Sequence, residues 1–179
     1  MHNVLITGTP GVGKTTLVKK LVDIFKSKDI DFDGFYTEEV RNGNARVGFD
    51  IVMLNNGKRG ILARKNSLNS SNSPMVGQYA VHVNEFEELV LHIFEKPKKL
   101  MIIDEIGKME MFSKKFQAGV RNVFNNKDIR VIATVPLNGG PLLVKQLKER
   151  SDCSLITVDH SNRNNLLPDI VKLFEEKYK

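Results

Sequence analysis

Short apolar runs alternate with amphipathic stretches along most of the chain. In the runs, apolar residues stand at consecutive positions, which is typical of strands buried on both faces. These runs are at residues 3–7, 99–103, 130–135 and 154–158. In the stretches between them, apolar residues recur three or four positions apart, which predicts helices. These stretches are at residues 14–28, 84–96, 113–126 and 141–150, with a last helix within 162–179. The alternation predicts an α/β fold, a mostly parallel sheet covered by helices on both faces.

The middle of the chain has a strand pattern instead. Residues 32–40, 45–54 and 59–63 are rich in β-branched and aromatic side chains, and the last two runs flank an Asn-Gly pair. Asn-Gly in that position is a strong hairpin signal. We therefore expect an antiparallel hairpin section added to the main sheet.

Other local signals place a loop, one more strand and two helix starts. Residues 64–78 are rich in Ser and Asn and are expected to form a loop, followed by a strand at 79–83. Asn84, with Glu87 three residues later, is predicted to cap one helix, and Ser113 another.

Composition changes this picture little. With 179 residues, no internal repeat and no visible linker, the chain is expected to be one domain over residues 1–179. A single cysteine, Cys153, excludes an internal disulfide and fits a reducing compartment. The beginning of the chain has no basic region or cleavage site, and no apolar run reaches the length of a membrane span. A cytoplasmic protein without a membrane partner is therefore expected.

The net charge is +6, which favours anionic partners. The charges are spread along the chain, however, and the densest basic cluster, at residues 96–99, is short. An anionic small substrate and nucleic acid both remain open on charge alone.

Residues 8–15 read GTPGVGKT, which fits the phosphate-loop pattern G-x-x-x-x-G-K-[ST]. An apolar strand precedes the pattern and an amphipathic helix follows it, as a phosphate loop requires. The glycines Gly8, Gly11 and Gly13 let backbone N–H groups point inward at an anion, and the helix N-terminus favours phosphate. We expect Lys14 to contact the β- and γ-phosphates and the Thr15 hydroxyl to bind Mg²⁺.

Two adjacent acids, Asp104 and Glu105, follow the apolar run at 99–103. The carboxyl ends of parallel strands lie at one edge of a sheet, so Asp104 is expected near Gly8. There it is predicted to hold the Mg²⁺ of a bound triphosphate. Because Mg²⁺ needs only one or two carboxylates, Glu105 is predicted instead to position or deprotonate the attacking water. A turn cap for Asp104 and a surface position for Glu105 are the alternatives.

Several further residues are candidates for the same edge. Thr134 follows a strand and is a candidate to sense the γ-phosphate, and Lys108 and Arg46 are candidates to stabilise the transition state. The guanine-reading pattern N-K-x-D is missing, and the four histidines have no metal-ligand spacing.

Six segments of the chain carry a family resemblance: TGTPGVGKTTL, DGFYTEEVR, VGFDIV, VGQY, IDEIGKMEMFS and NRNNLLPDIV. The first occurs in many families, whereas the second, fifth and last are much more specific. In these segments, collinear over nearly the whole chain, the sequence resembles the small P-loop nucleoside triphosphatases that include the eukaryotic cancer-related nucleoside triphosphatase. Ser161 and His82 depart from the family pattern, in which acids are expected. By the same resemblance, the pair Asn162 and Arg163 is a candidate for the base or ribose, or else for a helix cap.

The resemblance implies a RecA-like P-loop fold and slow, Mg²⁺-dependent hydrolysis of ATP, GTP, CTP and UTP by a monomer. The products would be a nucleoside diphosphate and phosphate. The adjacent acids of the family correspond to Asp104 and Glu105, and its signature lysine corresponds to Lys108. Together with the roles argued from the residues, catalysis is expected from Glu105 and Lys14, and metal binding from Thr15 and Asp104. The nucleotide-binding residues that it implies are Gly8, Thr9, Pro10, Gly11, Val12, Gly13, Lys14, Thr15 and Thr16, and then Leu100, Met101, Ile102, Ile103, Asp104, Glu105, Ile106 and Gly107.

Two other functions stay open from the residues. A small-molecule or nucleotide kinase would use the same phosphate loop, with residues 64–78 and four arginines as a lid over the acceptor. Those arginines are Arg41, Arg46, Arg59 and Arg64. A non-enzymatic nucleic-acid-binding module is less expected, because no interleaved aromatic and basic motif is present.

Overall fold

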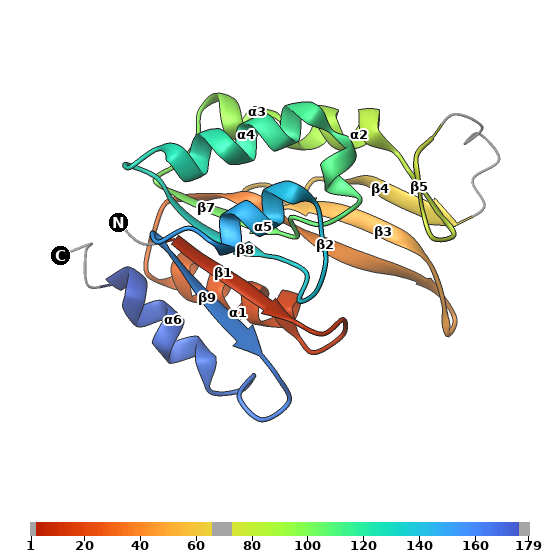
Figure 1. Cartoon of the computed structure of the whole chain (residues 1–179). Helices are drawn as coiled ribbons and strands as arrows, with labels where there is room; N and C mark the ends of the chain where they lie inside the picture. The colour runs from red at the N-terminus through yellow and green to blue at the C-terminus, as the bar shows by residue number, and fades with distance from the viewer. Residues whose placement is uncertain (1–2, 66–72, 176–179) are drawn as a thin grey trace.

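A computed structural model describes residues 3–65 and 73–175, and within these ranges nine strands form one mixed sheet (Figure 1). The strand order is β5-β6-β4-β3-β2-β7-β8-β1-β9. The strands are β1 (Asn3–Gly8), β2 (Phe32–Asn42), β3 (Ala45–Met53), β4 (Arg59–Lys65), β5 (Met75–Val76), β6 (Tyr79–Val81), β7 (Leu100–Asp104), β8 (Arg130–Thr134) and β9 (Cys153–Val158).

The sheet has a parallel half and an antiparallel half that meet at β2. Strands β2, β7, β8, β1 and β9 pair in parallel, whereas β3, β4, β6 and β5 continue the same sheet by antiparallel pairing. The predicted α/β class and the predicted hairpin around Asn56-Gly57 are confirmed. The β2–β3 hairpin reaches beyond the helical layers (Figure 1).

Helices cover both faces of the parallel half (Figure 1). They are α1 (Lys14–Ser27), α2 (Val83–Val90), α3 (His92–Glu95), α4 (Lys114–Asn125), α5 (Leu142–Lys148) and α6 (Leu166–Glu175), with a 3₁₀ turn η1 (Glu110–Phe112). In β7, Leu100 and Ile102 pack in the core under α1 and α6, while Met101 and Ile103 pack in the core under α2 to α5. Alternate residues of the apolar stretch Leu100–Ile103 therefore contribute to the cores on both faces of the sheet.

Three predicted helices begin or end elsewhere. The helix expected at 84–96 is two helices that part at Leu91, and its N-cap is His82 and not Asn84. The His82 amide pairs with the Leu62 carbonyl and the His82 carbonyl accepts the first helical bond, from Phe86. The end of β6 therefore sets this helix start and overrides the capping preference of Asn84.

The other two helices differ at one end. The last helix begins at Leu166, inside the range 162–179 predicted to contain it, because the Asp159 carboxylate accepts from the amides of Ser161 and Asn162 and holds a turn there. Helix α5 ends at Lys148, two residues before the predicted end. The predicted Ser113 cap is confirmed, since its hydroxyl accepts from the Phe116 amide.

The loop predicted at 64–78 is shorter than expected. Strand β4 continues to Lys65, and Met75–Val76 forms the edge strand β5. The part of that prediction at 66–72 lies outside the described residues.

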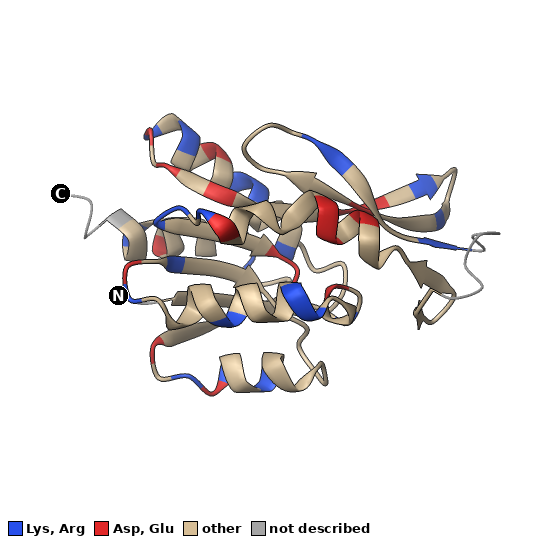
Figure 2. Cartoon of the chain, turned by 90° about the horizontal axis from the view of Figure 1, so that it is seen from above, with Lys and Arg blue, Asp and Glu red and all other residues tan. Residues whose placement is uncertain are grey.

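Charged residues of both signs are interspersed along the helices and strands (Figure 2). The net charge of +6 is therefore not gathered on a single element. None of the described helices is long and apolar enough to cross a membrane.

Gly34 sets how closely β2 approaches β7. Its φ is +143°, and a Cβ there would lie 1.8 Å from the Ile102 carbonyl oxygen. We expect Gly34→Ala to lower the free energy of unfolding by about 3 kcal/mol or more, because backbone strain and a main-chain clash add. Chemical denaturation measures the change.

Gly57→Ala is the matched control for Gly34→Ala. The φ of Gly57 is +69°, but no atom outside the adjacent residues lies within 4 Å of a Cβ added there. It should cost only about 1 kcal/mol, from backbone strain. Equal losses of unfolding free energy in the two variants would show that the close approach of β2 to β7 does not add to the cost of Gly34→Ala.

Candidate active site

The phosphate loop connects β1 to α1 and is shaped by glycines. Gly11 and Gly13 have φ of +77° and +115°, and a Cβ on Gly8 would lie 2.5 Å from the Val158 carbonyl oxygen. The Lys14 ammonium donates to the carbonyl oxygens of Gly8 at 2.9 Å and Thr9 at 3.3 Å. The loop is therefore a preformed anion cradle with its lysine folded across it.

Asp104 ends β7 beside this loop and is 1% exposed. The Thr134 hydroxyl donates to its Oδ1, and the Thr37 hydroxyl donates to its main-chain oxygen at 2.8 Å. Burial raises the pKa of the Asp104 carboxyl, and the nearby Thr134 and Thr15 hydroxyls and the Lys14 ammonium act in the opposite direction. Thr134 of β8 thus holds the carboxyl, and Thr37 of β2 holds the main chain that carries it.

The arrangement around Asp104 fits a magnesium ion. Its Oδ2 is buried and has no hydrogen-bond partner among the described residues, and such an orphaned oxygen is costly unless a ligand occupies it. Within the described ranges, no group of three or more acids, histidines or cysteines gathers as a complete metal site. Mg²⁺ suits this case, since it is commonly held by one or two carboxylates together with substrate phosphates.

Glu105 follows Asp104 through a cis peptide bond and lines the same hollow. Burial raises the pKa of its carboxyl, as does the neighbouring Asp104, whereas Lys14 lowers it. A carboxyl of raised pKa is a stronger base when ionised, which suits proton transfer from water.

A second buried acid, Glu110, supports the loop that carries Glu105. Its Oε2 accepts from the Gly107 amide at 3.0 Å, and burial raises its pKa to about 8. The Oε1 of Glu105 and the Oε2 of Glu110 would each lie 2.9 Å from a Cβ on Gly107. Only glycine lets both carboxyls approach this point of the backbone.

The antiparallel half of the sheet supplies the opposite wall of the site. The hollow has a volume of about 430 Å³ and is lined by loop and strand-end residues together with β2 and β3 residues. Sequence reasoning missed four of these: Thr37, Glu38, Glu39 and Phe49. All four lie in two segments that carry the family resemblance, DGFYTEEVR and VGFDIV, but the sequence analysis gave them no role at the site.

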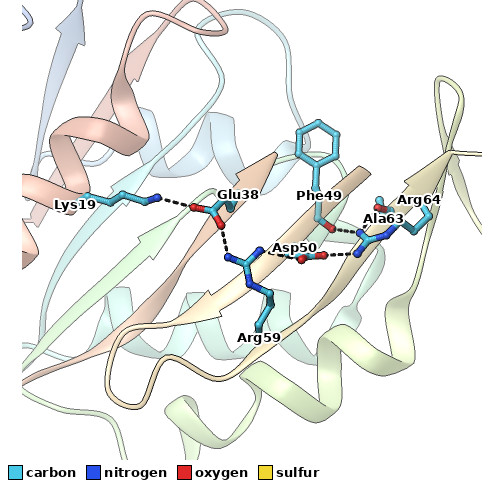
Figure 3. Close-up of polar contacts among 7 residues, drawn as sticks. All are labelled: Lys19, Glu38, Phe49, Asp50, Arg59, Ala63 and Arg64. Atoms are coloured by element: carbon cyan, nitrogen blue, oxygen red, sulfur yellow. Dashed lines mark hydrogen bonds and ion pairs between the residues drawn. The ribbon is translucent and has the colours of Figure 1, made fainter. Parts of the chain in front are cut away.

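An ion-pair network holds this wall (Figure 3). Lys19 of α1 contacts Glu38 of β2 at 2.7 Å, and Arg59 of β4 contacts both Glu38 and Asp50. Arg64 contacts the other oxygen of Asp50. The network joins the helix after the phosphate loop to three strands of the antiparallel half.

The structure separates the two candidate stabilising cations. Arg46 lines the hollow that contains Lys14, Asp104 and Glu105. Lys108 lines a different hollow of about 710 Å³, next to the exposed side chains of Phe112 and Leu142.

Other predicted residues lie around the site without lining this hollow. Four residues of β7 are fully buried in the sheet and position Asp104: Leu100, Met101, Ile102 and Ile103. Thr134 bonds Asp104 and is itself buried. Arg163 lies on the other side of the loop, where its Cδ would be 3.9 Å from a Cβ on Gly13. It lines a smaller hollow of about 170 Å³ with Lys20 and Asn164.

A protein-family model described as NTPase matches residues 3–171. The chain belongs to this NTPase family. It is 43% identical to the cancer-related nucleoside-triphosphatase homolog of Mus musculus, covering 97% of both chains. It is 41% identical to the nucleoside-triphosphatase THEP1 of Aquifex aeolicus, covering 96% of this chain and 98% of that one.

Solved structures of the same family match the fold of this chain. The crystal structure of THEP1 from Aquifex aeolicus matches 97% of this chain and 99% of its own with a TM-score of 0.84. The solution structure of a human cancer-related nucleoside triphosphatase matches all of both chains with a TM-score of 0.85, at 40% identity. The predicted family and the predicted P-loop fold are confirmed, and these matches give the kinase alternative no support.

The buried Glu110 gives the stability a predictable pH dependence. Its pKa is about 8 in the folded protein against an ordinary 4.5. The folded state therefore binds more protons between these values, and stability present at low pH is lost as the pH rises toward 8. We expect the melting temperature of Glu110→Gln to fall less between pH 5 and 8 than that of the unmodified protein, measured without metal.

The melting temperature of Glu110→Gln will still fall somewhat with rising pH, because the pKa values of Asp104 and Glu105 are also raised. Glu88→Gln, at an exposed position on α2, is the control and should keep the full slope. If the melting temperatures of Glu110→Gln and the unmodified protein fell equally between pH 5 and 8, the raised pKa of Glu110 would be contradicted.

Proposed function

We propose that the protein hydrolyses nucleoside 5′-triphosphates to diphosphate and phosphate with Mg²⁺, with broad tolerance of the base. The observation that carries this proposal is the juxtaposition of Lys14, Asp104 and Glu105 in one hollow. The names of relatives, nucleoside-triphosphatases from Mus musculus and Aquifex aeolicus, support it.

The phosphate loop binds the substrate. Its amides and Lys14 contact the phosphates, so Lys14 exchanges its two carbonyl partners for phosphate oxygens. Thr15 and Asp104 would hold Mg²⁺, which would supply positive charge to the phosphate oxygens. Thr134 and Thr37 keep Asp104 in position for this role.

Glu105 acts on the water. It lines the hollow beside Asp104 but does not share its partners, Thr134 and Thr37. We assign it to orienting the attacking water and accepting its proton. Glu110 and Gly107 hold the backbone that follows it.

The surroundings of the nucleoside favour broad base tolerance. The small hollow beside Gly13 is lined by Arg163, Asn164 and Lys20, whose side chains are exposed or partly exposed. Strong discrimination between bases needs buried polar groups that would be left unpaired by the wrong base. Exposed side chains do not impose that penalty.

One feature weighs against the kinase alternative. Of the four arginines proposed as a lid, Arg59 and Arg64 are paired with Asp50, and Arg41 is paired with Glu39. They are therefore engaged in the sheet. A monomeric state, a cytoplasmic location and the absence of a nucleic-acid partner stay predictions from the sequence.

The test is phosphate release from ATP, GTP, CTP and UTP, with Mg²⁺ or with EDTA, without any added acceptor. We expect release from all four with Mg²⁺ and none with EDTA. In Glu105→Gln, turnover should fall about 10²–10⁴-fold, the usual contribution of a general base, while nucleotide affinity is kept.

The outcomes separate the alternatives. Full turnover by Glu105→Gln would remove Glu105 from the mechanism. Phosphate release that requires a second substrate would favour the kinase. Exposed Glu88→Gln is the control for the substitution itself.

A further inference from the structure

The phosphate loop has two sides, and they carry different groups. Arg163 and Asn164 lie on the side of Gly13 and Lys20. Asp104, Glu105 and the β2–β3 wall lie on the other side. Because a nucleotide held by the loop extends to both sides, the nucleoside belongs with Arg163 and the γ-phosphate with the two acids. This assignment rests on the proposed function.

Arg46 is the second cation on the γ-phosphate side. Of the described residues that line the hollow containing Asp104 and Glu105, two carry a positive charge, Lys14 and Arg46. The Arg46 side chain is 41% exposed, and its guanidinium lies 5.4 Å from the centre of the Phe49 ring. Stacking on an aromatic ring limits the conformations of the side chain and points it along β3 toward the site.

The partner of Arg46 leaves it free to move. Its Nη2 contacts Glu39 Oε1 at 2.8 Å, while Arg41 contacts Glu39 Oε2 at 2.8 and 3.1 Å through two nitrogens. An exposed ion pair of this kind contributes little in water. When a triphosphate arrives, Arg46 can exchange Glu39 for the γ-phosphate, and Glu39 still keeps Arg41 as its counter-ion.

The other nearby cations form ion pairs with other acids or line another hollow. Lys19 and Arg59 both contact Glu38, and Arg64 contacts Asp50. Lys108 lines the separate hollow on the α4 side. The signature lysine of the IDEIGKMEMFS segment therefore does not reach the hollow that holds Lys14.

We propose that Arg46 contacts the γ-phosphoryl group and stabilises the charge on its oxygens during hydrolysis, with Glu39 and Phe49 holding it ready. An arginine fits this task because its planar fork pairs two phosphate oxygens at once. The step adds no group to the reaction: water attacks phosphorus, the bond to the β-phosphate oxygen breaks, and the proton of the water goes to Glu105.

The test compares Arg46→Ala with Arg41→Ala. Both remove an arginine paired with Glu39, but only Arg46 lines the hollow. Arg46→Ala should lower kcat with Mg²⁺ and ATP by about 10²–10³-fold, the usual effect of a lost donor to transition-state charge. Affinity for ADP should stay within about threefold, since ADP has no γ-phosphate. Arg41→Ala should change kcat less than about threefold.

Two further measurements make the result decisive. Arg46→Lys should recover only part of kcat, because it keeps the charge and loses the fork. Melting temperatures should be alike in all variants, because these side chains are exposed. A kcat of Arg46→Ala within threefold of the unmodified protein, or an equal loss in Arg41→Ala, would overturn the role of Arg46.

Failure of the proposed function would look different. In that case the unmodified protein would release no phosphate from any triphosphate. If it does release phosphate and Arg46→Ala does so equally fast, only the role of Arg46 fails.

Discussion

The buried carboxyl of Asp104 is the feature on which the rest of the site depends. Placing it at the end of β7 takes it out of water, and burying an unpaired charge is strongly unfavourable. Thr134, from β8, bonds one oxygen, and Thr37, from β2, bonds the main chain behind it. The second oxygen has no hydrogen-bond partner within residues 3–65 and 73–175. The proposed Mg²⁺ would make this arrangement favourable by contacting that oxygen.

The parallel half of the sheet is what makes those contacts meet. Tyr36 lies opposite Asp104, and Ile6, two residues before the end of β1, lies opposite Thr134. The acid, its threonine and the phosphate loop therefore reach one edge together. The antiparallel half then adds the opposite wall, held by ion pairs from α1 to β4 (Figure 3).

The parts predictable from sequence are those that local geometry determines. The glycine spacing in 8–15 can serve few purposes other than an anion cradle, and Asp104 follows a strand that must be buried on both faces. The prediction that Asn84 caps its helix was wrong, because the pairing of His82 with Leu62 sets where that helix begins. Local capping preference carries no information about where a preceding strand ends.

The opposite wall was not predictable for a related reason. In a strand, alternate residues face opposite sides, but a single sequence does not say which face meets the phosphate loop. Glu38, Glu39 and Phe49 reach the site through pairing between β2 and β3 and between β2 and β7. Arg46 and Lys108 were equal candidates until the fold put them in different hollows.

Melting temperatures of Asp104→Asn, with ADP in EDTA and with ADP and Mg²⁺, test the central claim that Asp104 is buried in order to hold a cation. Asparagine keeps an oxygen to accept from Thr134 and removes the buried charge, so the metal-free variant should be at least as stable as the unmodified protein. The unmodified protein should gain at least about 3 °C from Mg²⁺, roughly the shift that 1 kcal/mol gives a domain of this size, and Asp104→Asn should gain almost none. An undiminished gain in Asp104→Asn would contradict the account.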